Sequence, residues 1–178
     1  GRNRRFAFER LRAHDPEAWH ALKVAADQAV RALPEGLLHG NDRDPQAIAA
    51  TRANLSALGG PDWVAAVRIS QGAAEQLMPP EAGSTGGLLV CNPPYGERLE
   101  TLATLRAWYP ELGRWMKRSL AGWTACFITA DREFPSGIGF RPTRRTPLYN
   151  GPLECRLYEF EMYAGSRRVS ARPISTLV

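Results

Sequence analysis

The chain has 178 residues, of which 44% are hydrophobic and 23% are charged. This composition is typical of a globular chain and excludes wholesale disorder, and the length suits about one domain. No apolar run approaches the roughly 20 residues of a membrane-spanning helix, so we expect no membrane span. The cysteines Cys91, Cys126 and Cys155 are widely separated, and no histidine cluster accompanies them. We therefore expect no disulfide framework, no metal site and a reducing, cytoplasmic location.

Basic residues outnumber acidic residues by 23 to 18, which gives a net charge of +5. Only Lys23 and Lys117 are lysines, and the other basic residues are arginines, whose planar fork suits phosphates and base edges. A GC-rich genome also favours arginine codons, so charge alone leaves nucleic-acid binding open. Arginine clusters lie in residues 1–14 and 164–178, which we interpret as a basic lead-in and a basic tail or linker.

Helix-start signals and apolar spacing predict two helices and two strands in the first half of the chain. Asp15 and Asp44 each precede a proline, which is typical of an N-cap followed by the first helical position. Gly59-Gly60 is a stop signal for the second helix. The expected elements are a helix over 16–33, a buried strand over 37–40, a helix over 45–58 and a strand over about 64–70.

The second half of the chain continues the alternation and ends in a hairpin. Its expected elements are a short helix within 71–86, strands over 87–91 and 124–130, a helical region over 102–120, and paired strands over 142–149 and 154–163. Pro110 should interrupt the helical region because proline lacks an amide hydrogen. Strands that alternate with helices indicate an α/β fold with a mostly parallel sheet covered on both faces, to which the hairpin adds an antiparallel edge.

The turn Gly40-Asn41-Asp42-Arg43-Asp44 follows the first expected strand and opens a helix. An acidic side chain at this place in an α/β fold accepts hydrogen bonds from the ribose hydroxyls of a nucleotide cofactor. The simpler interpretation is that both aspartates cap the helix. Because Asp44 directly precedes Pro45, it is the better cap, and we assign ribose binding to Asp42.

The run Asn92-Pro93-Pro94-Tyr95 follows the strand expected at 87–91. Two prolines also end a strand in a simple turn, but a turn explains neither the asparagine before them nor the tyrosine after them. The Asn92 amide oxygen and a proline carbonyl can accept both hydrogens of a planar amino group, and Tyr95 can stack on the plane that carries it. The prolines hold the backbone so that these groups converge, so we predict all four residues as a catalytic amine site.

This run with its continuation to Leu99, the acidic turn and the segment Asn150–Cys155 together resemble one enzyme family. The family is that of the bacterial 23S ribosomal RNA guanine-N2 methyltransferases that carry a THUMP domain, and the resemblance extends from about Phe6 to Tyr163. It implies a Rossmann-like class I methyltransferase fold, with S-adenosylmethionine as cofactor and large-subunit ribosomal RNA as partner.

The resemblance also implies the roles of individual residues. Asp42, Ala73 and Asn92 would bind the cofactor, with Asp42 on its ribose. Asn92 and Pro93 would hold the guanine amine, Pro94 would complete the motif, and Tyr95 would stack on the flipped base. An adenine N6 amine or a protein glutamine amide satisfies the same geometry, and the basic balance favours RNA over protein.

Two features depart from the family pattern. The aspartate that reads the cofactor adenine is absent, because the sequence there runs Gln71-Gly72-Ala73-Ala74-Glu75. We expect a backbone amide near Ala73 or the Glu75 side chain to take this role. The glycine-rich motif after the family's first strand is also absent before Asp15. We therefore expect residues 15–163 to be a partial catalytic domain with a gap in its sheet, inactive without the upstream first motif and THUMP domain, or alternatively a non-catalytic RNA-binding fragment.

Overall fold

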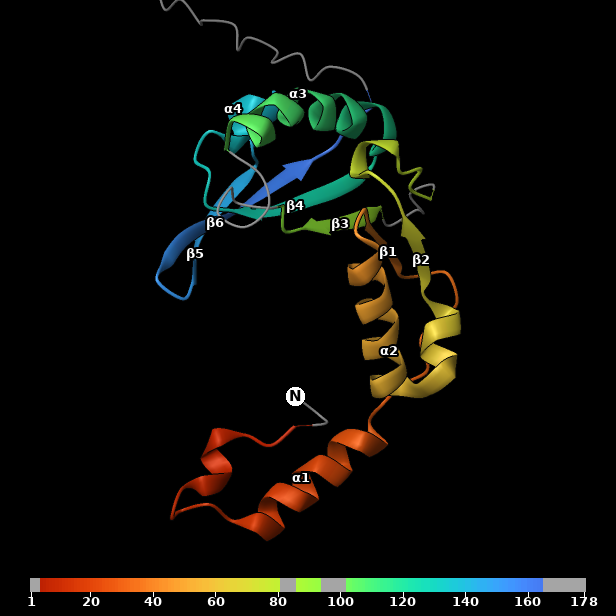
Figure 1. Ribbon diagram of the computed structural model, residues 1–178, viewed down its shortest axis with the longest axis vertical. Helices are drawn as coiled ribbons and strands as arrows, with labels where there is room; N and C mark the ends of the chain where they lie inside the picture. Colours follow the sequence, from red (N-terminus) through yellow and green to blue (C-terminus); the bar gives the residue numbers. More distant parts are fainter. Residues whose placement is uncertain (1–3, 81–85, 94–101, 165–178) are drawn as a thin grey trace, which may run out of the picture. The chain divides into compact units, whose positions relative to one another are not determined.

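The structure is a computed structural model that describes residues 4–80, 86–93 and 102–164. The chain divides into two compact units, an N-terminal unit (Gly1–Ala74) and a C-terminal unit (Glu75–Val178). Both units combine strands with helices, and the described strands form two separately hydrogen-bonded sheets (Figure 1). No helix in these ranges is long and apolar enough to cross a membrane.

The N-terminal unit holds one pair of parallel strands. Its elements are the 3-10 helix η1 (Ala7–Arg10), α1 (Pro16–Gln28), β1 (His39–Asp42), α2 (Pro45–Ala66) and β2 (Arg68–Gln71). In the parallel pair, His39 lies opposite Arg68 and Asp42 lies opposite Gln71. Helix α2 contacts both strands, so the unit is a small helix-covered ladder.

The two predicted helix starts are confirmed. Asp15 caps α1 because its Oδ1 accepts hydrogen bonds from the amides of Glu17 and Ala18, both at 3.0 Å. Asp44 caps α2, with its Oδ1 2.8 Å from the amide nitrogen of Gln46. Each aspartate thus satisfies amide hydrogens that have no partner inside the helix.

Element ends in the N-terminal unit differ from the sequence predictions. Helix α1 ends at Gln28, earlier than its apolar spacing predicts. Helix α2 breaks at Gly60, as the Gly-Gly signal predicts, because glycine adopts the φ of 73° found there at little cost. A second helical segment then runs from Pro61 to Ala66, where the sequence predicts the start of a strand. Proline favours this segment because its ring fixes a helical φ and its missing amide needs no partner.

The apolar residues of the N-terminal unit are not buried. Leu22 of α1 is 59% exposed, and Val30 and Leu37 are 46% and 66% exposed. The prediction of a buried strand over 37–40 is therefore wrong. Strand β1 begins only at His39, and none of its residues is buried. An amphipathic pattern shows which side chains favour burial, but burial itself requires an element that packs over them.

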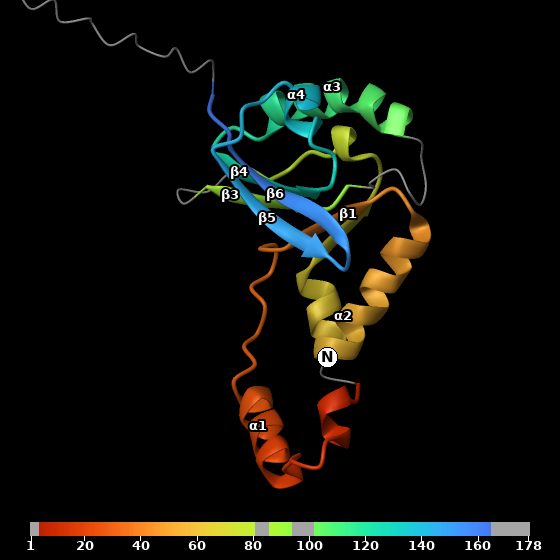
Figure 2. The same ribbon diagram turned by 90° about the vertical axis from the view of Figure 1, so that its left-hand side faces the viewer.

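The C-terminal unit is a four-stranded sheet with helices on one face. Its elements are η2 (Ala74–Gln76) at the unit boundary, β3 (Gly87–Cys91), α3 (Leu102–Ser119), β4 (Trp123–Thr129), α4 (Phe134–Ile138), β5 (Arg144–Asn150) and β6 (Leu153–Glu161). The strand order is β3-β4-β6-β5, in which β3 and β4 are parallel and β6 is antiparallel to both neighbours (Figure 2). The predicted hairpin with an edge strand is confirmed. The described strands of this sheet form both parallel and antiparallel pairs.

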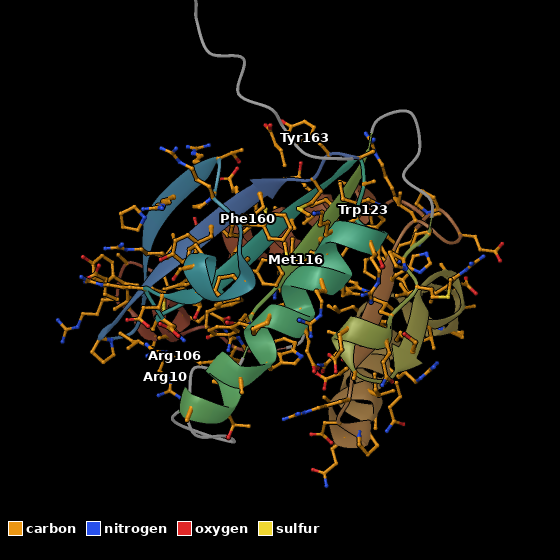
Figure 3. All side chains as sticks on the ribbon, turned by 90° about the horizontal axis from the view of Figure 1, so that it is seen from above. Arg10, Arg106, Met116, Trp123, Phe160 and Tyr163 are labelled. Carbon is orange, nitrogen blue, oxygen red and sulfur yellow. The ribbon has the colours of Figure 1, made fainter. Side chains whose placement is uncertain are left out.

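A hydrophobic core lies between this sheet and helices α3 and α4. Figure 3 shows two of its members, Met116 on α3 and Phe160 on β6, both of which are buried. Leu89 of β3 packs against the core, so its neighbours Leu88 and Val90 point to the opposite face, and each is 64% exposed. Within the described part of this unit, helices therefore cover one face of the sheet, not the two that the sequence predicts.

Pro110 lies inside α3 without interrupting it, contrary to the prediction. The helix is continuous from Leu102 to Ser119. Tyr109 and Leu112 on either side of the proline are buried in the core. Their burial offsets the one backbone hydrogen bond that proline removes.

Candidate functional site

The acidic turn lies at the carboxyl end of β1. Asp42 is the last residue of this strand, and its Oδ1 accepts a hydrogen bond of 2.9 Å from the amide of Asp44. The carboxylate of Asp44 is engaged in the α2 cap, as the sequence predicts. Asp42 is exposed. The turn thus holds an exposed carboxylate at the end of a parallel strand, which is a place where α/β folds bind ligands.

A hydrogen-bond network joins the ends of β1 and β2. Asn41 Nδ2 donates to the carbonyl of Gly72 at 2.9 Å, and Ser70 Oγ donates to Asn41 Oδ1 at 2.9 Å. The amide of Gly72 also donates to the carbonyl of Asp42 at 3.0 Å. The backbone that leads to Ala73 is thereby fixed to the strand that carries Asp42. Sequence reasoning missed this role, although Asn41 and Ser70 lie opposite each other in the register.

The two candidates for reading the adenine are placed differently. Ala73 follows β2 in the N-terminal unit, whereas Glu75 belongs to the C-terminal unit. There, Glu75 Oε2 accepts a hydrogen bond of 2.9 Å from Trp108 Nε1 of α3. Trp115 Nε1 donates to the carbonyl of Leu77 at 2.7 Å, so the two indoles hold residues 75–77 against α3. The Glu75 side chain therefore helps to hold α3 within the C-terminal unit.

The described half of the predicted amine site lies at the carboxyl end of β3. Asn92 and Pro93 directly follow this strand, and Asn92 is exposed whereas Pro93 is buried. Cys91 lies opposite Phe127 in the parallel β3–β4 pair, so these two residues reach the same sheet edge as the last residues of β4. Pro94 and Tyr95, which complete the predicted site, lie outside the described residues.

A carboxylate at the end of β4 was missed by the sequence analysis. The side chain of Asp131 is 6% exposed and accepts hydrogen bonds from Arg106 and from the Tyr109 hydroxyl of α3. Burial alone would raise the pKa of Asp131, but the hydrogen bonds, above all those from Arg106, hold it below its ordinary value. Burial and the Asp131 charge raise the pKa of Tyr109. An acidic residue after a buried strand is the signal that could have identified Asp131.

The hairpin turn lies at the same edge because β6 runs antiparallel to β4. Close to this turn, Arg132 Nη2 donates to both carboxylate oxygens of Glu154 at 3.2 Å. Arg156 Nη2 lies 3.5 Å from Glu154 Oε1. Two arginines therefore share the Glu154 carboxylate beside the hairpin turn.

The predicted site residues fall into two groups. Asp42 and Ala73 lie close together in the N-terminal unit, and Asn92 and Pro93 lie together in the C-terminal unit. Each group occupies the carboxyl end of a parallel strand pair. Open α/β sheets bind their ligands at these ends, so the structure places each group where a ligand site is expected.

An α/β fold with polar residues at the carboxyl ends of its parallel strands defines a class of ligand-binding folds. Residues 1–159 match the family model described as "RMKL-like, methyltransferase domain". The chain therefore belongs to this family. "Ribosomal RNA large subunit methyltransferase K/L" of Hahella chejuensis is 37% identical over 174 residues, which are 96% of this chain and 24% of that protein. The chain spans about a quarter of the length of the curated relatives it matches.

Solved structures share the fold. The crystal structure of SMU.472 complexed with SAH matches with a TM-score of 0.74 and 28% identity, over 93% of this chain and 42% of that one. A predicted N6-adenine-specific DNA methylase from Listeria monocytogenes str. 4b F2365 matches with a TM-score of 0.71 and 25% identity, over 91% of this chain and 40% of that one. These likenesses confirm the class I methyltransferase fold.

Proposed function

We propose that the protein transfers a methyl group from S-adenosylmethionine to the N2 amine of a guanine in 23S ribosomal RNA. The observation that carries the proposal is the position of Asn92 and Pro93 at the carboxyl end of a parallel strand pair. The name of the K/L relative supports large-subunit ribosomal RNA as substrate, and the SAH complex of SMU.472 supports the cofactor.

Asp42 fits the ribose of this cofactor. Its carboxylate is exposed and is held at the strand end by the Asp44 amide, and a carboxylate can accept hydrogen bonds from both hydroxyls of a ribose. We assign the adenine edge to the backbone at Ala73, which the Asn41–Gly72 hydrogen bond holds beside Asp42. When bound, S-adenosylmethionine supplies an electrophilic methyl group carried on sulfur.

Asn92 and Pro93 hold the target amine in this proposal. The Asn92 amide oxygen and the Pro93 carbonyl each accept one of its hydrogens, which exposes the nitrogen lone pair for direct attack. Pro93 is buried, so the backbone that presents this carbonyl is preorganised. Pro94 completes the motif, and Tyr95 stacks on the flipped base. Alignment of this kind supplies most of the rate enhancement.

The substrate is tested by methylation with the full-length product of the gene. Ribosomal RNA from a strain that lacks the gene should accept labelled methyl groups and yield N2-methylguanosine on digestion. Label in N6-methyladenosine would show that adenine is the target. Label in release-factor protein but not in RNA would contradict the RNA substrate.

Two substitutions test the assigned roles in the same protein. Asn92→Ala should abolish methyl transfer, whereas Asn54→Ala, which changes an exposed asparagine of α2, should leave it unchanged. Asp42→Asn should weaken S-adenosylmethionine binding about tenfold or more in calorimetry, because a charged acceptor is lost. Asp62→Asn is its matched control at an exposed position of α2. Wild-type turnover in Asn92→Ala would remove that residue from the mechanism.

We also propose that residues 1–178 are inactive by themselves and bind S-adenosylmethionine only weakly. The proposal is supported by the length of the match, because the chain covers only 24% of the Hahella chejuensis protein. It follows the resemblance, which implies that a glycine-rich motif and a THUMP domain complete the enzyme. Calorimetry with the 178-residue chain tests it, and tight cofactor binding by that chain would contradict it.

A further inference from the structure

An aromatic cluster of Phe6, Phe8 and Trp19 joins the short helix η1 to helix α1 in the N-terminal unit (Figure 2). The rings of Phe8 and Trp19 pack edge to face with centroids 5.0 Å apart, and Phe6 packs on Trp19 in the same way at 5.7 Å. Such pairs are favourable because the positive edge of one ring meets the negative face of the other. Lys23 Nζ lies 5.5 Å from the centroid of the Trp19 ring, which places a cation beside the aromatic cluster.

A pocket of about 310 Å³ opens beside the aromatic cluster. Its lining is mainly apolar and includes Phe8, Leu11 and Leu22, which are 40%, 63% and 59% exposed. The volume is at the lower end of the range for small-ligand sites, so it suits one flat ring system better than a long apolar segment. The pocket therefore offers an exposed aromatic ring and apolar walls to a planar group.

The polar lining of the pocket argues against an anion inside it. His14 and Asp15 are its polar members. The Asp15 carboxylate is held in place because its Oδ1 accepts the amides of Glu17 and Ala18 at the start of α1. A carboxylate repels a phosphate but accepts hydrogen bonds from the amino and imino groups of a base, and an imidazole adds a donor or an acceptor. A group with flat apolar faces and a polar edge fits this lining, and a nucleobase has both.

Arginines alternate with the residues that line the pocket. Arg10 and Arg12 stand on either side of Leu11 in the sequence. Both are exposed, and neither forms an ion pair within the described part of the chain. Residues 4–14 contain four arginines and a single acid, Glu9. Guanidinium groups next to a base-sized pocket can bind the phosphates on the two sides of an inserted base.

We propose that the pocket between η1 and α1 binds an unstacked base of single-stranded RNA, with Arg10 and Arg12 on the flanking phosphates. Binding sites for single strands combine aromatic side chains with a basic surface in this way. Among the described residues, none of those assigned to methyl transfer lines the pocket, so its role is to hold RNA and not to react with it. The inference rests on the proposed function for the choice of RNA among acidic polymers.

Substitutions at Phe8 test the base contact in the full-length gene product. The measurement is the fluorescence anisotropy of a labelled single-stranded RNA of mixed sequence. Phe8→Leu keeps an apolar side chain but removes the ring, so the affinity should fall about tenfold, whereas Phe8→Trp keeps a stacking surface and should lose less than about threefold. Tyr149→Leu removes an exposed ring from β5 and is the control, with unchanged affinity expected. Wild-type affinity in Phe8→Leu, or no affinity of the wild type for this RNA, would overturn the inference.

Substitutions of the arginines should change the salt dependence of binding instead. Arg10→Gln combined with Arg12→Gln should reduce the slope of log affinity against log salt concentration by about 1.4, since each phosphate contact on a single strand contributes about 0.7. Phe8→Leu should leave this slope unchanged, because the ring carries no charge. Lys117→Gln combined with Arg118→Gln removes the same charge from exposed positions of α3 and is the matched control. An equal change of slope in both double variants would overturn the assignment of the phosphates to Arg10 and Arg12.

Two further measurements test for other occupants of the pocket. If another part of the full-length protein fills it, Phe8→Leu lowers the melting temperature and leaves the affinity for RNA unchanged, which overturns the inference. Duplex RNA keeps its bases stacked, so its affinity should be the same for Phe8→Leu and the wild type. Equal losses of affinity for duplex and single-stranded RNA would contradict a base in the pocket.

The inference and the proposed function can fail separately, because binding and methyl transfer are measured separately. If the wild type methylates guanine in ribosomal RNA and Phe8→Leu binds single-stranded RNA as tightly as the wild type, only the inference fails. If the losses of affinity are as expected but the methyl groups appear on adenine, only the proposed substrate fails.

Discussion

Both units of the chain contain a parallel strand pair that ends in polar residues, yet only the C-terminal pair rests on a hydrophobic core. Every buried side chain among the described residues belongs to the C-terminal unit. There, the rings of Phe127 on β4 and Phe134 on α4 pack with centroids 5.0 Å apart. In the N-terminal unit, Leu22 and Leu37 stay exposed although they lie in similar apolar patterns.

The difference shows that a strand pair can carry polar residues at its carboxyl end without a hydrophobic core beneath it. The β1–β2 pair is held by its backbone ladder, by the Asn41–Gly72 hydrogen bond and by the Ser70–Asn41 hydrogen bond. A typical hydrogen bond contributes about 1 kcal/mol, whereas burial of a large apolar side chain contributes about 1.5–3 kcal/mol. We therefore expect the two units to respond differently to substitution.

The largest contrast is expected from core truncation. Phe127→Ala should lower the free energy of unfolding of the C-terminal unit by about 3–5 kcal/mol, because it removes buried area and leaves a cavity. Leu22→Ala, at an exposed position of the N-terminal unit, should change stability by less than about 0.5 kcal/mol. Native-state hydrogen exchange of amides in β4, β6 and α1 measures both. Equal effects would contradict the contrast between the units.

A smaller effect is expected where α3 meets α4. A Cβ at Gly113 would overlap the carbonyl oxygen of Ile138, so Gly113→Ala should destabilise by about 1–3 kcal/mol despite the better helix propensity of alanine. Gly72→Ala is the matched control in the N-terminal unit, because nothing lies within 4 Å of a Cβ there. Thermal unfolding of both variants tests the difference. A stabilised Gly113→Ala protein would show that the two helices are not closely packed.

Loss of a helix cap should act on the N-terminal unit alone. Asp44→Ala removes the acceptor of the Gln46 amide and should cost about 1 kcal/mol in α2. Hydrogen exchange should become faster in the first turn of α2 and stay unchanged in β4. Glu35→Ala, which changes an exposed acid outside the helices, should leave both regions unaffected. Faster exchange in β4 would show that the stabilities of the two units are linked.

The smallest effect on stability is expected from lowering the pH. Hydrogen bonds hold the pKa of Asp131 below the ordinary aspartate value of about 3.9. Because the folded pKa is the lower one, the ionised carboxylate contributes stability that is complete above this value and is lost as the pH falls towards the folded pKa. The melting temperature of Asp131→Asn should therefore fall less steeply than that of the wild type below about pH 4. Parallel curves would contradict this role for Asp131.

Local signals in the sequence predicted a large part of the fold. The caps at Asp15 and Asp44, the break at Gly60 and the C-terminal hairpin were all predicted, because each depends on neighbouring residues. The uninterrupted passage of α3 through Pro110 and the second segment of α2 were not predicted. In α3, packing of the apolar face outweighs a local signal, and packing partners are distant in the sequence.

The candidate site was predicted in part for the same reason. Asp42 and Asn92 were identified because each follows a strand in a recognisable pattern, and the structure places both at strand ends. The contact between Trp108 and Glu75 joins residues 33 positions apart, so no local pattern indicates it. It engages the Glu75 side chain, one of the two candidates for the adenine contact, in a hydrogen bond to α3.

The sequence by itself determined the methyltransferase family that the motifs resemble and indicated candidate site residues, because motifs are short and local. The tertiary structure decided how those residues are supported. It gave the C-terminal strand pair a core and left the described apolar residues of the N-terminal unit half-buried or exposed, since burial depends on elements far apart in the chain. It also brought Asp131 to Arg106, a contact between β4 and α3 that exists only because those two elements pack together.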